Sequence, residues 1–403
     1  MKHLKKSDKK SYITLFVKNL FTLKSDKKSY ITLFAKILFI LELVALPAGL
    51  IYMAITQLFP VKYLLLLLVL SICLVVFHIR MFLTKTRGSA TKVISLILSI
   101  LVLLVSSVGT VVLGTIHTSF SKIPDAEVEV EALKTNVTKN PFIVYLSGVD
   151  TRGGGEIRDK ARSDVNMIIA INPKTNKILM VNTPRDFYVP LEGDPAKMDK
   201  LTHAGTKGVS CSMKTLEALY DIKFNYYVKV NFESVVDVVD TLGGITVNSE
   251  YNFTSFHSLN NDTTYTFVKG ENKLTGLSAL AFARERKNVP GGDPTRGKHQ
   301  QLIIKAIINK VISPSNLTPT KISKIVDCIT RNTNTNVSYG EISDLVKLQL
   351  DKMPSWDIQT ISVGGEGATK PTYVTGGLNA YVMIPDEETV EKAKLQIRSC
   401  LEG

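Results

Sequence analysis

The first third of the chain consists of long apolar runs separated by short basic links. Three runs, Lys36–Phe59, Tyr63–Leu83 and Val93–Ile116, each hold roughly the twenty residues that span the hydrocarbon of a membrane. We expect Glu42 to stay hydrated near the start of the first run. We expect His78 to reach the interface at the end of the second. The pattern predicts three transmembrane helices over residues 36–116.

From Phe142 the pattern changes to short apolar segments with turn residues between them. Alternating apolar runs predict strands, and apolar residues at helical spacing predict helices. Expected strands cover 142–150, the two arms of 163–186, 226–230, 245–251 and 357–363. Expected helices cover 211–220, 232–244 with Gly243 and Gly244 at its end, 271–286 with a turn, 300–311, 339–352 and from about 385 onward. This alternation predicts an α/β fold with a central sheet covered by helices.

The segments outside the spans have distinct characters. Residues 1–35 form a basic tail, and the eighteen-residue unit Lys6–Leu23 recurs almost unchanged as Lys24–Leu41, whose end overlaps the first apolar run. Such a tail suits an anionic lipid surface, although a duplication without a role explains it equally well. Residues 117–141 form a polar tether, and 142–403 show no internal linker and are expected to form one domain.

Charge and cysteine usage narrow the class of protein. The net charge is +13, and the mean hydropathy is also positive, which favours a membrane protein with a basic face over a nucleic-acid binder. Basic residues in the N-terminus and at 85–92 place both segments in the cytoplasm, and three spans then place everything after about His117 outside. The four cysteines lack the spacing of a zinc site, and at most one disulfide can form among Cys211, Cys328 and Cys400.

The densest chemistry lies in the stretch from Ala281 to Val311. A loop rich in Gly and Pro joins two packed elements there, and guanidinium groups stand at both of its ends. Arg presents planar, forked donors that match phosphate oxygens. The candidate residues of this stretch are Arg284, Arg286, Asp293, Arg296, Lys298 and Gln300.

Further candidates lie near the ends of predicted strands, where α/β sheets bind ligands. They are Asp150, Arg162, Asp164, Arg185 and Asp186, with Lys200 and His203 nearby. Carboxylates with water suit Mg²⁺, and Arg neutralises phosphate charge, so together they indicate phosphoryl transfer.

Each piece also has a plainer interpretation. Asp150 is equally well a turn-capping residue, Arg162–Asp164 a surface ion pair and the basic loop a solvated one, while Lys200 and His203 are more often structural. The segment Gly292–Lys298 matches the spacing of a P-loop. His299 replaces the Ser or Thr that would hold Mg²⁺, and no strand with a tight turn precedes the segment, so both features argue against a P-loop.

Seven separated motifs, in order, resemble the LytR-CpsA-Psr family of bacterial cell-envelope phosphotransferases. They are GVDTR, RSDVNMIIAINP, TPRDFYV, DKLTHAG, NYYVKVNFESVVDVVDTLGGI, ALAFARER and GGDPTRGKHQQ, and the match covers about Phe142 to Val311. The resemblance implies the fold of this family, in which helices cover a central mixed β-sheet. It also implies transfer of a glycan polymer from an undecaprenyl-diphosphate carrier to peptidoglycan outside the membrane. The three-span N-terminus resembles the capsule-associated branch, so capsular polysaccharide and capsule assembly proteins are the implied polymer and partners.

The resemblance also implies a role for each site residue. Asp150 and Asp164 correspond to the carboxylates that bind Mg²⁺ or Mn²⁺. The implied diphosphate clamp consists of Arg162, Arg185, Arg284 and Arg286, completed by Gln300, and Lys200 is placed with the substrate-binding residues. Asp293 and Arg296 match loop residues near the phosphates, where one residue of the group activates the acceptor hydroxyl. The faces of Phe232–Leu242 and Leu302–Ile312 are expected to line a groove for the prenyl chain.

The sequence departs from the family pattern in two respects, and two other functions compete with glycan transfer. The tether is too short for the extra folded domain that three-span relatives carry, and the GGG at 153–155 changes the loop after Asp150. The alternatives are hydrolysis of the diphosphate lipid, and a non-catalytic binder of it that regulates polysaccharide assembly. A transcription regulator is excluded because the short cytoplasmic tail has no recognisable helix-turn-helix.

Overall fold

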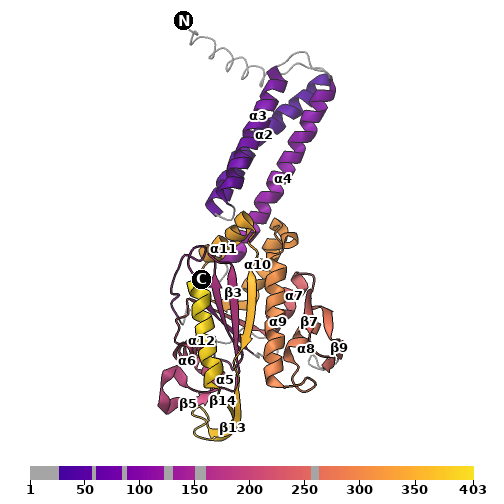
Figure 1. Cartoon of the computed structure of the whole chain (residues 1–403). Coiled ribbons are helices and arrows are strands. Elements are labelled where there is room, and N and C mark those ends of the chain that lie inside the picture. Colours follow the sequence, from indigo (N-terminus) through magenta and orange to yellow (C-terminus); the bar gives the residue numbers. More distant parts are fainter. Residues whose placement is uncertain (1–26, 57–59, 84–88, 122–129, 150–159, 256–262) are drawn as a thin grey trace. The chain divides into compact units, whose positions relative to one another are not determined.

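A computed structural model describes residues 27–56, 60–83, 89–121, 130–149, 160–255 and 263–403 (Figure 1). The chain divides into two compact units, Met1–Thr115 and Ile116–Gly403. The first copy of the N-terminal repeat lies outside the described residues, and most of the second copy lies in the first helix.

The first unit contains three helices, α2 (Lys27–Thr56), α3 (Val61–Leu83) and α4 (Ser89–Ser121). Among the described residues, Lys36–Ile55 of α2 and Val61–Arg80 of α3 are long and apolar enough to cross a membrane. The apolar stretch of α4, Leu96–Val111, is shorter. The structure therefore shows two such helices where the hydropathy pattern predicted three.

Glu42 and His78 are both buried, contrary to the expectation that Glu42 stays hydrated and His78 reaches the interface. Their side chains are 0% and 1% exposed, and Oε2 of Glu42 lies 3.0 Å from Nδ1 of His78, close enough for an ion pair. The Oγ atom of Ser99 lies 3.2 Å from Nε2 of His78. One polar residue from each helix thus meets inside the first unit. Ionisable groups in apolar surroundings are stabilised by such pairing, and the sequence could not show this packing.

The second unit is built on a six-stranded mixed sheet. Its order is β11-β6-β1-β2-β3-β12. Strands β1, β2 and β3 pair antiparallel in succession, while β6 runs parallel to β1 and β12 parallel to β3. The six strands are β1 (Phe142–Val149), β2 (Ser163–Asn172), β3 (Lys177–Thr183), β6 (Tyr226–Asn231), β11 (Thr333–Thr335) and β12 (Asp357–Ser362).

This topology gathers particular strand ends at one edge of the sheet. Because β2 is antiparallel to its neighbours, its first residues lie beside the last residues of β1 and β3. Val149 is the partner of Ser163, and Thr183 is the partner of Asn166. The last residues of β6 and β12 lie at the same edge, since these strands run parallel to β1 and β3. Segments that leave these ends are therefore brought together.

Both faces of the sheet are covered, as its alternating side chains require. Ile168 and Val181 face one side, where the core includes residues of α6 (Val209–Tyr220) and α12 (Glu387–Glu402). Met167 and Met180 face the other side, against α9 (Asp293–Ile312). Figure 1 shows α12 and α9 flanking the strands. The prediction of a sheet covered by helices is confirmed.

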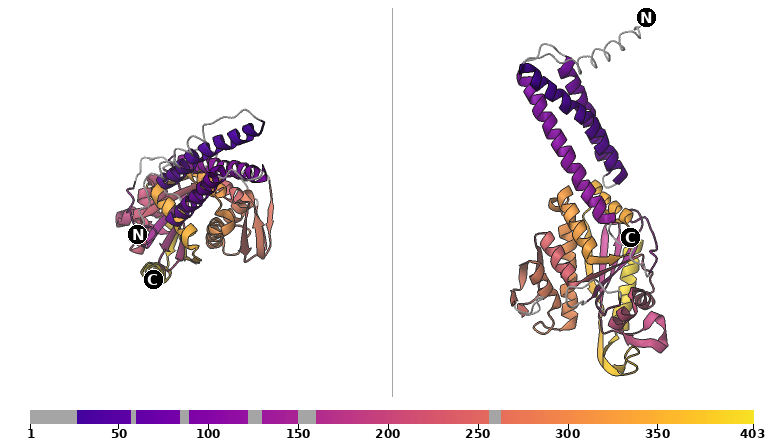
Figure 2. Two further views of the ribbon diagram at one scale, coloured as in Figure 1. Left: turned by 90° about the horizontal axis from the view of Figure 1, so that it is seen from above. Right: turned by 180° about the vertical axis from the view of Figure 1, so that it is seen from behind.

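Smaller elements surround this core. Two hairpins matter for the site: β4 pairs with β5, and β13 pairs with β14, extending beyond the end of the sheet (Figure 2). The remaining elements are β4 (Tyr188–Pro190), β5 (Met198–Lys200), α5 (Leu201–Ala204), α7 (Phe232–Thr241), β7 (Ile245–Ser249), β8 (Phe253–Ser255), β9 (Tyr265–Phe267), β10 (Gly270–Leu274), α8 (Gly276–Arg284), α10 (Pro319–Asn332), α11 (Tyr339–Lys352), β13 (Gly365–Pro371), β14 (Asn379–Pro385) and short 3₁₀ turns.

Two predicted elements need correction. Residues 271–274 were expected to begin a helix but belong to strand β10, which pairs with β7. Helix α9 begins at Asp293, seven residues before the expected start, so Asp293, Arg296 and Lys298 lie on a helix and not in a loop. Pro294 is well placed there because a helix tolerates proline in its first turn. The hairpins β4–β5, β8–β9 and β13–β14 were not predicted.

Close packing of α7 against α8 generates a stability prediction. A Cβ at Gly276 would lie 2.4 Å from the carbonyl oxygen of Val236 and 2.8 Å from its Cα, which are backbone atoms of α7. We expect Gly276→Ala to lower the free energy of unfolding by about 1–3 kcal/mol, because the helices must separate. Urea unfolding followed by the fluorescence of the single tryptophan, Trp356, reports on this unit alone.

The matched control is Gly340→Ala in α11. A Cβ at Gly340 meets only the Oγ of Ser338, at 3.9 Å, and its φ is not in the left-handed region. Since Ala favours a helix over Gly, this variant should be as stable as the native protein or more so. Equal stability of the two variants would contradict the packing argument.

Candidate functional site

The centre of the site is an ion pair across two adjacent strand ends. Asp164 is the second residue of β2, and Arg185 follows β3 by two residues. The Nη1 of Arg185 donates to Oδ1 of Asp164 over 2.9 Å, and its Nε lies 3.7 Å from Oδ2 of Asp186. The side chains are 16–23% exposed, so a ligand can reach this pair.

Helix α9 adds a second ion pair from its first turn. The Nη2 of Arg296 lies 2.6 Å from Oδ1 of Asp293, at the i,i+3 spacing of one helical face. Gly297 lets this turn approach the sheet, since a Cβ there would lie 2.2 Å from Nδ2 of Asn182 on β3. This glycine thus serves close packing, which explains the P-loop-like spacing without a P-loop.

The two pairs form one electrostatic cluster. Burial alone would lower the pKa of Arg185, but the charges of Asp164, Asp186 and Asp293 raise it. The pKa of Arg296 is lowered by burial and by the positive charges of Arg185 and Arg286, against the opposing effect of Asp293 and Asp164. The guanidinium groups of Arg185 and Arg286 therefore both repel that of Arg296. This repulsion favours an anionic ligand with several oxygens.

An apolar cavity lies near this cluster, because its lining includes Val165, which follows Asp164, and Gln300, one turn of α9 after Arg296. It has a volume of about 230 Å³ and lies between β1, β2, β6 and the helices α7, α8 and α9. Its lining includes Val235 and Val238 of α7 and Ile303, Ile304 and Ile307 of α9. These side chains come from the two helix faces that the sequence analysis assigned to a prenyl groove.

Two predicted site residues connect the cavity to the charged cluster. Gln300 lines the cavity and follows Arg296 by four residues, about one turn of α9. The guanidinium of Arg284 stacks over the ring of Phe232, 4.5 Å from its centroid, and Phe232 also lines the cavity. The cavity therefore has polar groups at the side nearest the cluster.

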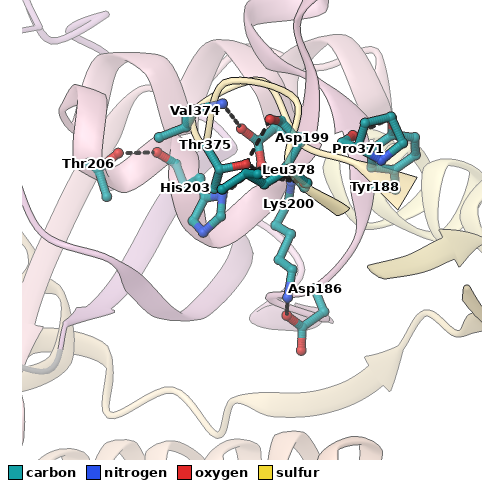
Figure 3. Close-up of polar contacts among 11 residues, drawn as sticks. Asp186, Tyr188, Asp199, Lys200, His203, Thr206, Pro371, Val374, Thr375 and Leu378 are labelled. Atoms are coloured by element: carbon teal, nitrogen blue, oxygen red, sulfur yellow. Dashed lines mark hydrogen bonds and ion pairs between the residues drawn. The ribbon is translucent and has the colours of Figure 1, made fainter. Parts of the chain in front are cut away.

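On its other side the cluster continues into the hairpin β4–β5. The Nζ of Lys200 lies 3.0 Å from Oδ1 of Asp186, and Figure 3 shows the lysine side chain reaching that carboxylate. The fully buried Asp199 accepts hydrogen bonds from the backbone of Lys200 and Val374 and lies 2.7 Å from Nδ1 of His203. Burial alone would raise the pKa of Asp199, but these partners lower it. His203 thus has a structural role, the plainer of the two interpretations.

The structure does not bring all of the predicted site residues into the charged cluster. Arg162 and Arg286 have exposed side chains near the cluster, at the start of β2 and just after α8. Asp150, the predicted partner of Asp164 in metal binding, lies outside the described residues, as does the GGG loop after it.

The donor set fits a hard cation of modest coordination demand. Among the described residues, no three His, Cys, Asp or Glu side chains gather as a metal site. Mg²⁺ is usually held by one or two carboxylates, with water and substrate phosphates as its other ligands. The partly exposed carboxylate of Asp164, beside guanidinium groups suited to phosphate, matches that pattern.

Sequence reasoning missed two contributions to the site. Asp186 was noted beside Arg185 but was given no role, although it joins Arg185 to Lys200. Asp199 was not singled out. The i,i+4 spacing of Asp199 and His203, at the end of a short strand, was the only available signal, and such pairs are common in helices.

Comparison with known proteins finds matches that cover most of the second unit. A model described as the LytR_cpsA_psr family matches residues 111–398. The polyisoprenyl-teichoic acid–peptidoglycan teichoic acid transferase TagU of Bacillus licheniformis is 36% identical over 268 residues, which cover 65% of this chain and 83% of TagU. The protein of the same name from Bacillus subtilis is 40% identical over 233 residues, covering 58% and 70% of the two chains.

Solved structures agree with these relatives. The crystal structure of B. subtilis TagV matches with a TM-score of 0.53 and 30% identity, covering 66% of this chain and 98% of that one. TagT bound to LIIa-WTA matches with a TM-score of 0.53 and 26% identity, covering 69% and 98%.

A buried histidine beside the site generates a pH prediction. His299 is 2% exposed and stacks on Phe253 and Phe282, and burial lowers its pKa to about 4. An unfolded chain binds the proton near pH 6.5, so stability should fall as the pH drops from 6.5 to 4. The loss is about 3 kcal/mol.

The control is His299→Gln, which keeps a hydrogen-bonding side chain but does not titrate. Urea unfolding of both proteins, followed by Trp356 fluorescence between pH 7 and 4, measures the difference. The variant should lose less stability than the native protein over this range. Parallel pH profiles would show that His299 is not held neutral in the fold.

Proposed function

Because this chain belongs to the LytR-CpsA-Psr family, we propose that it transfers a glycopolymer from a polyisoprenyl diphosphate carrier to peptidoglycan. The observation that carries the proposal is the junction of the charged cluster with the apolar cavity. Arg185, Arg286 and Arg296 suit a diphosphate, and the adjoining cavity suits a hydrocarbon chain. A prenyl diphosphate has these two parts in direct connection.

The guanidinium groups would act on the charge of the leaving group. In the transfer, the acceptor hydroxyl oxygen bonds to the glycan-bearing phosphorus, the bond to the lipid phosphate breaks, and the hydroxyl proton is released. Prenyl phosphate departs as an anion. Arg185 and Arg296 are held in place by Asp164 and Asp293, so they can stabilise that charge with little reorganisation.

The cavity would hold the first part of the prenyl chain. Burial of each CH₂ contributes about 0.8 kcal/mol, so even a short buried section binds the carrier firmly. Binding there fixes the diphosphate beside Arg296, because Gln300 stands between the cavity lining and that arginine on the same helix.

A divalent cation completes the proposed chemistry. Asp164, together with Asp150, would hold Mg²⁺ or Mn²⁺. Such an ion supplies further neutralisation of the phosphate oxygens when bound. The support for it is the donor set at Asp164 and the family resemblance of both carboxylates.

We further propose that α4 is a third membrane crossing. Its 33 residues measure about 50 Å along the axis, longer than the roughly 30 Å of hydrocarbon. With the basic N-terminus in the cytoplasm, three crossings place the second unit outside the membrane, where peptidoglycan lies. Two crossings would place it on the wrong side.

For the transferred polymer we propose only a class, a cell-envelope glycopolymer. The names of the relatives support teichoic acid, and the three-helix N-terminus supports capsular polysaccharide through its resemblance to the capsule-associated branch. Undecaprenyl diphosphate is the proposed carrier in either case. Both polymers reach the site on the same prenyl diphosphate, so the proposed chemistry is the same.

The function is tested with the full chain in detergent, a polyprenyl-diphosphate-linked glycan, Mg²⁺ and a soluble peptidoglycan fragment. We expect native protein to release prenyl phosphate and place glycan on the fragment. Asp164→Ala and Arg286→Ala should each reduce the rate by about 100-fold or more. Arg398→Ala, which removes an exposed arginine on α12, is the matched control and should be unaffected.

The other outcomes identify the alternatives. Release of prenyl phosphate that does not depend on the fragment would indicate a hydrolase. Tight binding of the lipid without turnover would indicate a binder. Full activity of Arg286→Ala would contradict its assignment to the diphosphate clamp.

A second prediction concerns the cavity. Val238 lines it from α7 and is only partly buried, so Val238→Trp should fill space without disrupting the core. We expect the KM for the lipid-linked substrate to rise about tenfold or more, because about two CH₂ groups of lost burial suffice. Val238→Ile is the conservative control, and an unchanged KM in the tryptophan variant would exclude the cavity as the prenyl site.

A further inference from the structure

The hairpin β13–β14 carries an unusual group of exposed apolar side chains. Tyr373 is 45% exposed, Leu378 69% and Tyr381 54%. Tyr373 and Leu378 lie in the turn that joins the two strands, and Tyr381 lies in the first half of β14. Exposed apolar groups gathered in this way mark an interaction surface more often than isolated ones do.

Despite this exposure, the hairpin is firmly held. The backbone N–H of Val374 donates to Oδ2 of the buried Asp199 over 2.6 Å, and the hydroxyl of Tyr188 donates to the carbonyl of Pro371 over 2.9 Å. Figure 3 shows these contacts around Asp199 and Lys200. The aromatic rings are thus presented on a fixed support.

The same support connects the hairpin to the charged cluster. The backbone N–H of Met383 donates to the carbonyl of Asp186 over 2.7 Å. The Nζ of Lys200 lies 3.0 Å from the carboxylate of Asp186 and 5.8 Å from the ring centroid of Tyr381. A second ammonium, that of Lys207, lies 5.6 Å from the ring centroid of Tyr373. Both distances suit a cation–π contact.

These residues follow one order through the second unit. Gln300 at the cavity lies about one turn of α9 from Arg296, and the charge of Arg185 acts on Arg296. Arg185 lies beside Asp186, Asp186 contacts Lys200, and Lys200 lies beside the ring of Tyr381. The proposed prenyl anchor and the hairpin are therefore at opposite ends of this series. The diphosphate would occupy its middle.

In phosphoryl transfer the attacking and leaving oxygens are roughly in line across the phosphorus. If the leaving prenyl phosphate is held on the cavity side, the acceptor hydroxyl must approach from the other side. That is the side on which Lys200 and the hairpin lie. The chemistry of the surface suits a sugar, because an aromatic ring can cover the C–H face of a pyranose while an ammonium donates to its hydroxyls.

We propose that Tyr381 and Tyr373, with Lys200 and Lys207, form the subsite for the sugar rings of the acceptor glycan strand. This inference rests on the proposed transferase function, which it deepens by assigning the acceptor side. The surface positions the acceptor hydroxyl toward the cluster, and Tyr381, nearest to Lys200, contributes most.

The test measures acceptor binding apart from catalysis. The full chain in detergent is titrated calorimetrically with soluble peptidoglycan glycan fragments, with no lipid substrate present. We expect Tyr381→Ala to weaken binding by about 2-fold to 10-fold, and the double variant with Tyr373→Ala to weaken it further. Tyr381→Phe, which keeps the ring, should bind nearly as the native protein does. Leu395→Ala, an equally exposed site on α12, should have no effect.

Kinetics then separates this inference from the proposed function. In the transfer assay, Tyr381→Ala should raise the KM for the acceptor and leave the KM for the lipid-linked substrate unchanged. Native affinity of the Tyr381→Ala variant for the fragments would overturn the inference while leaving the transferase intact. Absence of transfer by native protein would overturn the function, and the calorimetric result would still decide the subsite. A raised KM for the lipid-linked substrate, or a changed oligomeric state, would assign the surface to lipid or to a second copy and overturn the inference.

Discussion

Crowding of positive charge at one edge of a sheet is the constraint on which this site depends. Arg185 and Arg286 each act electrostatically on Arg296, and burial strengthens such interactions. Asp164 and Asp293 hold two of the three guanidinium groups in fixed positions. Within the described part of the chain, the exposed guanidinium of Arg286 has no carboxylate partner, so this member of the cluster is short of negative charge. A ligand with several anionic oxygens relieves that shortage, and the geometry is in place before it arrives.

The topology of the sheet explains how distant residues reach this edge. Asp164 and Arg185 are brought together because β2 and β3 are antiparallel neighbours. The parallel strands β6 and β12 end at the same edge, so α7 and the hairpin β13–β14 begin there too. One set of strand directions therefore places the cavity wall, the charged cluster and the aromatic surface in sequence. No single local sequence motif specifies this spatial arrangement.

The sequence predicted the parts that local patterns control. Apolar runs bounded by turn residues identified β1, β2 and β3, and arginine density identified the stretch around Arg296. Where tertiary contacts decide, it failed. The segment 271–274 becomes a strand because β7 offers it a partner, and Glu42 is buried because His78 meets it from another helix. The hairpin β13–β14 lacks a strong apolar pattern, since its side chains are largely exposed, and so its aromatic residues drew no attention.

The ion pairs of the two units differ in a way that suits their surroundings. Glu42 and His78 are almost completely buried, and separating such a pair would leave charge or polar groups in apolar surroundings at considerable cost. Asp164, Arg185 and Asp293 remain 18–26% exposed. Partly hydrated pairs contribute little net stability, so Arg185 can exchange a carboxylate oxygen for a phosphate oxygen without destabilising the fold. The contact between Glu42 and His78 in the first unit is thus shielded from solvent. The site keeps its contacts ordered but open to exchange, which the proposed turnover of charged substrates requires.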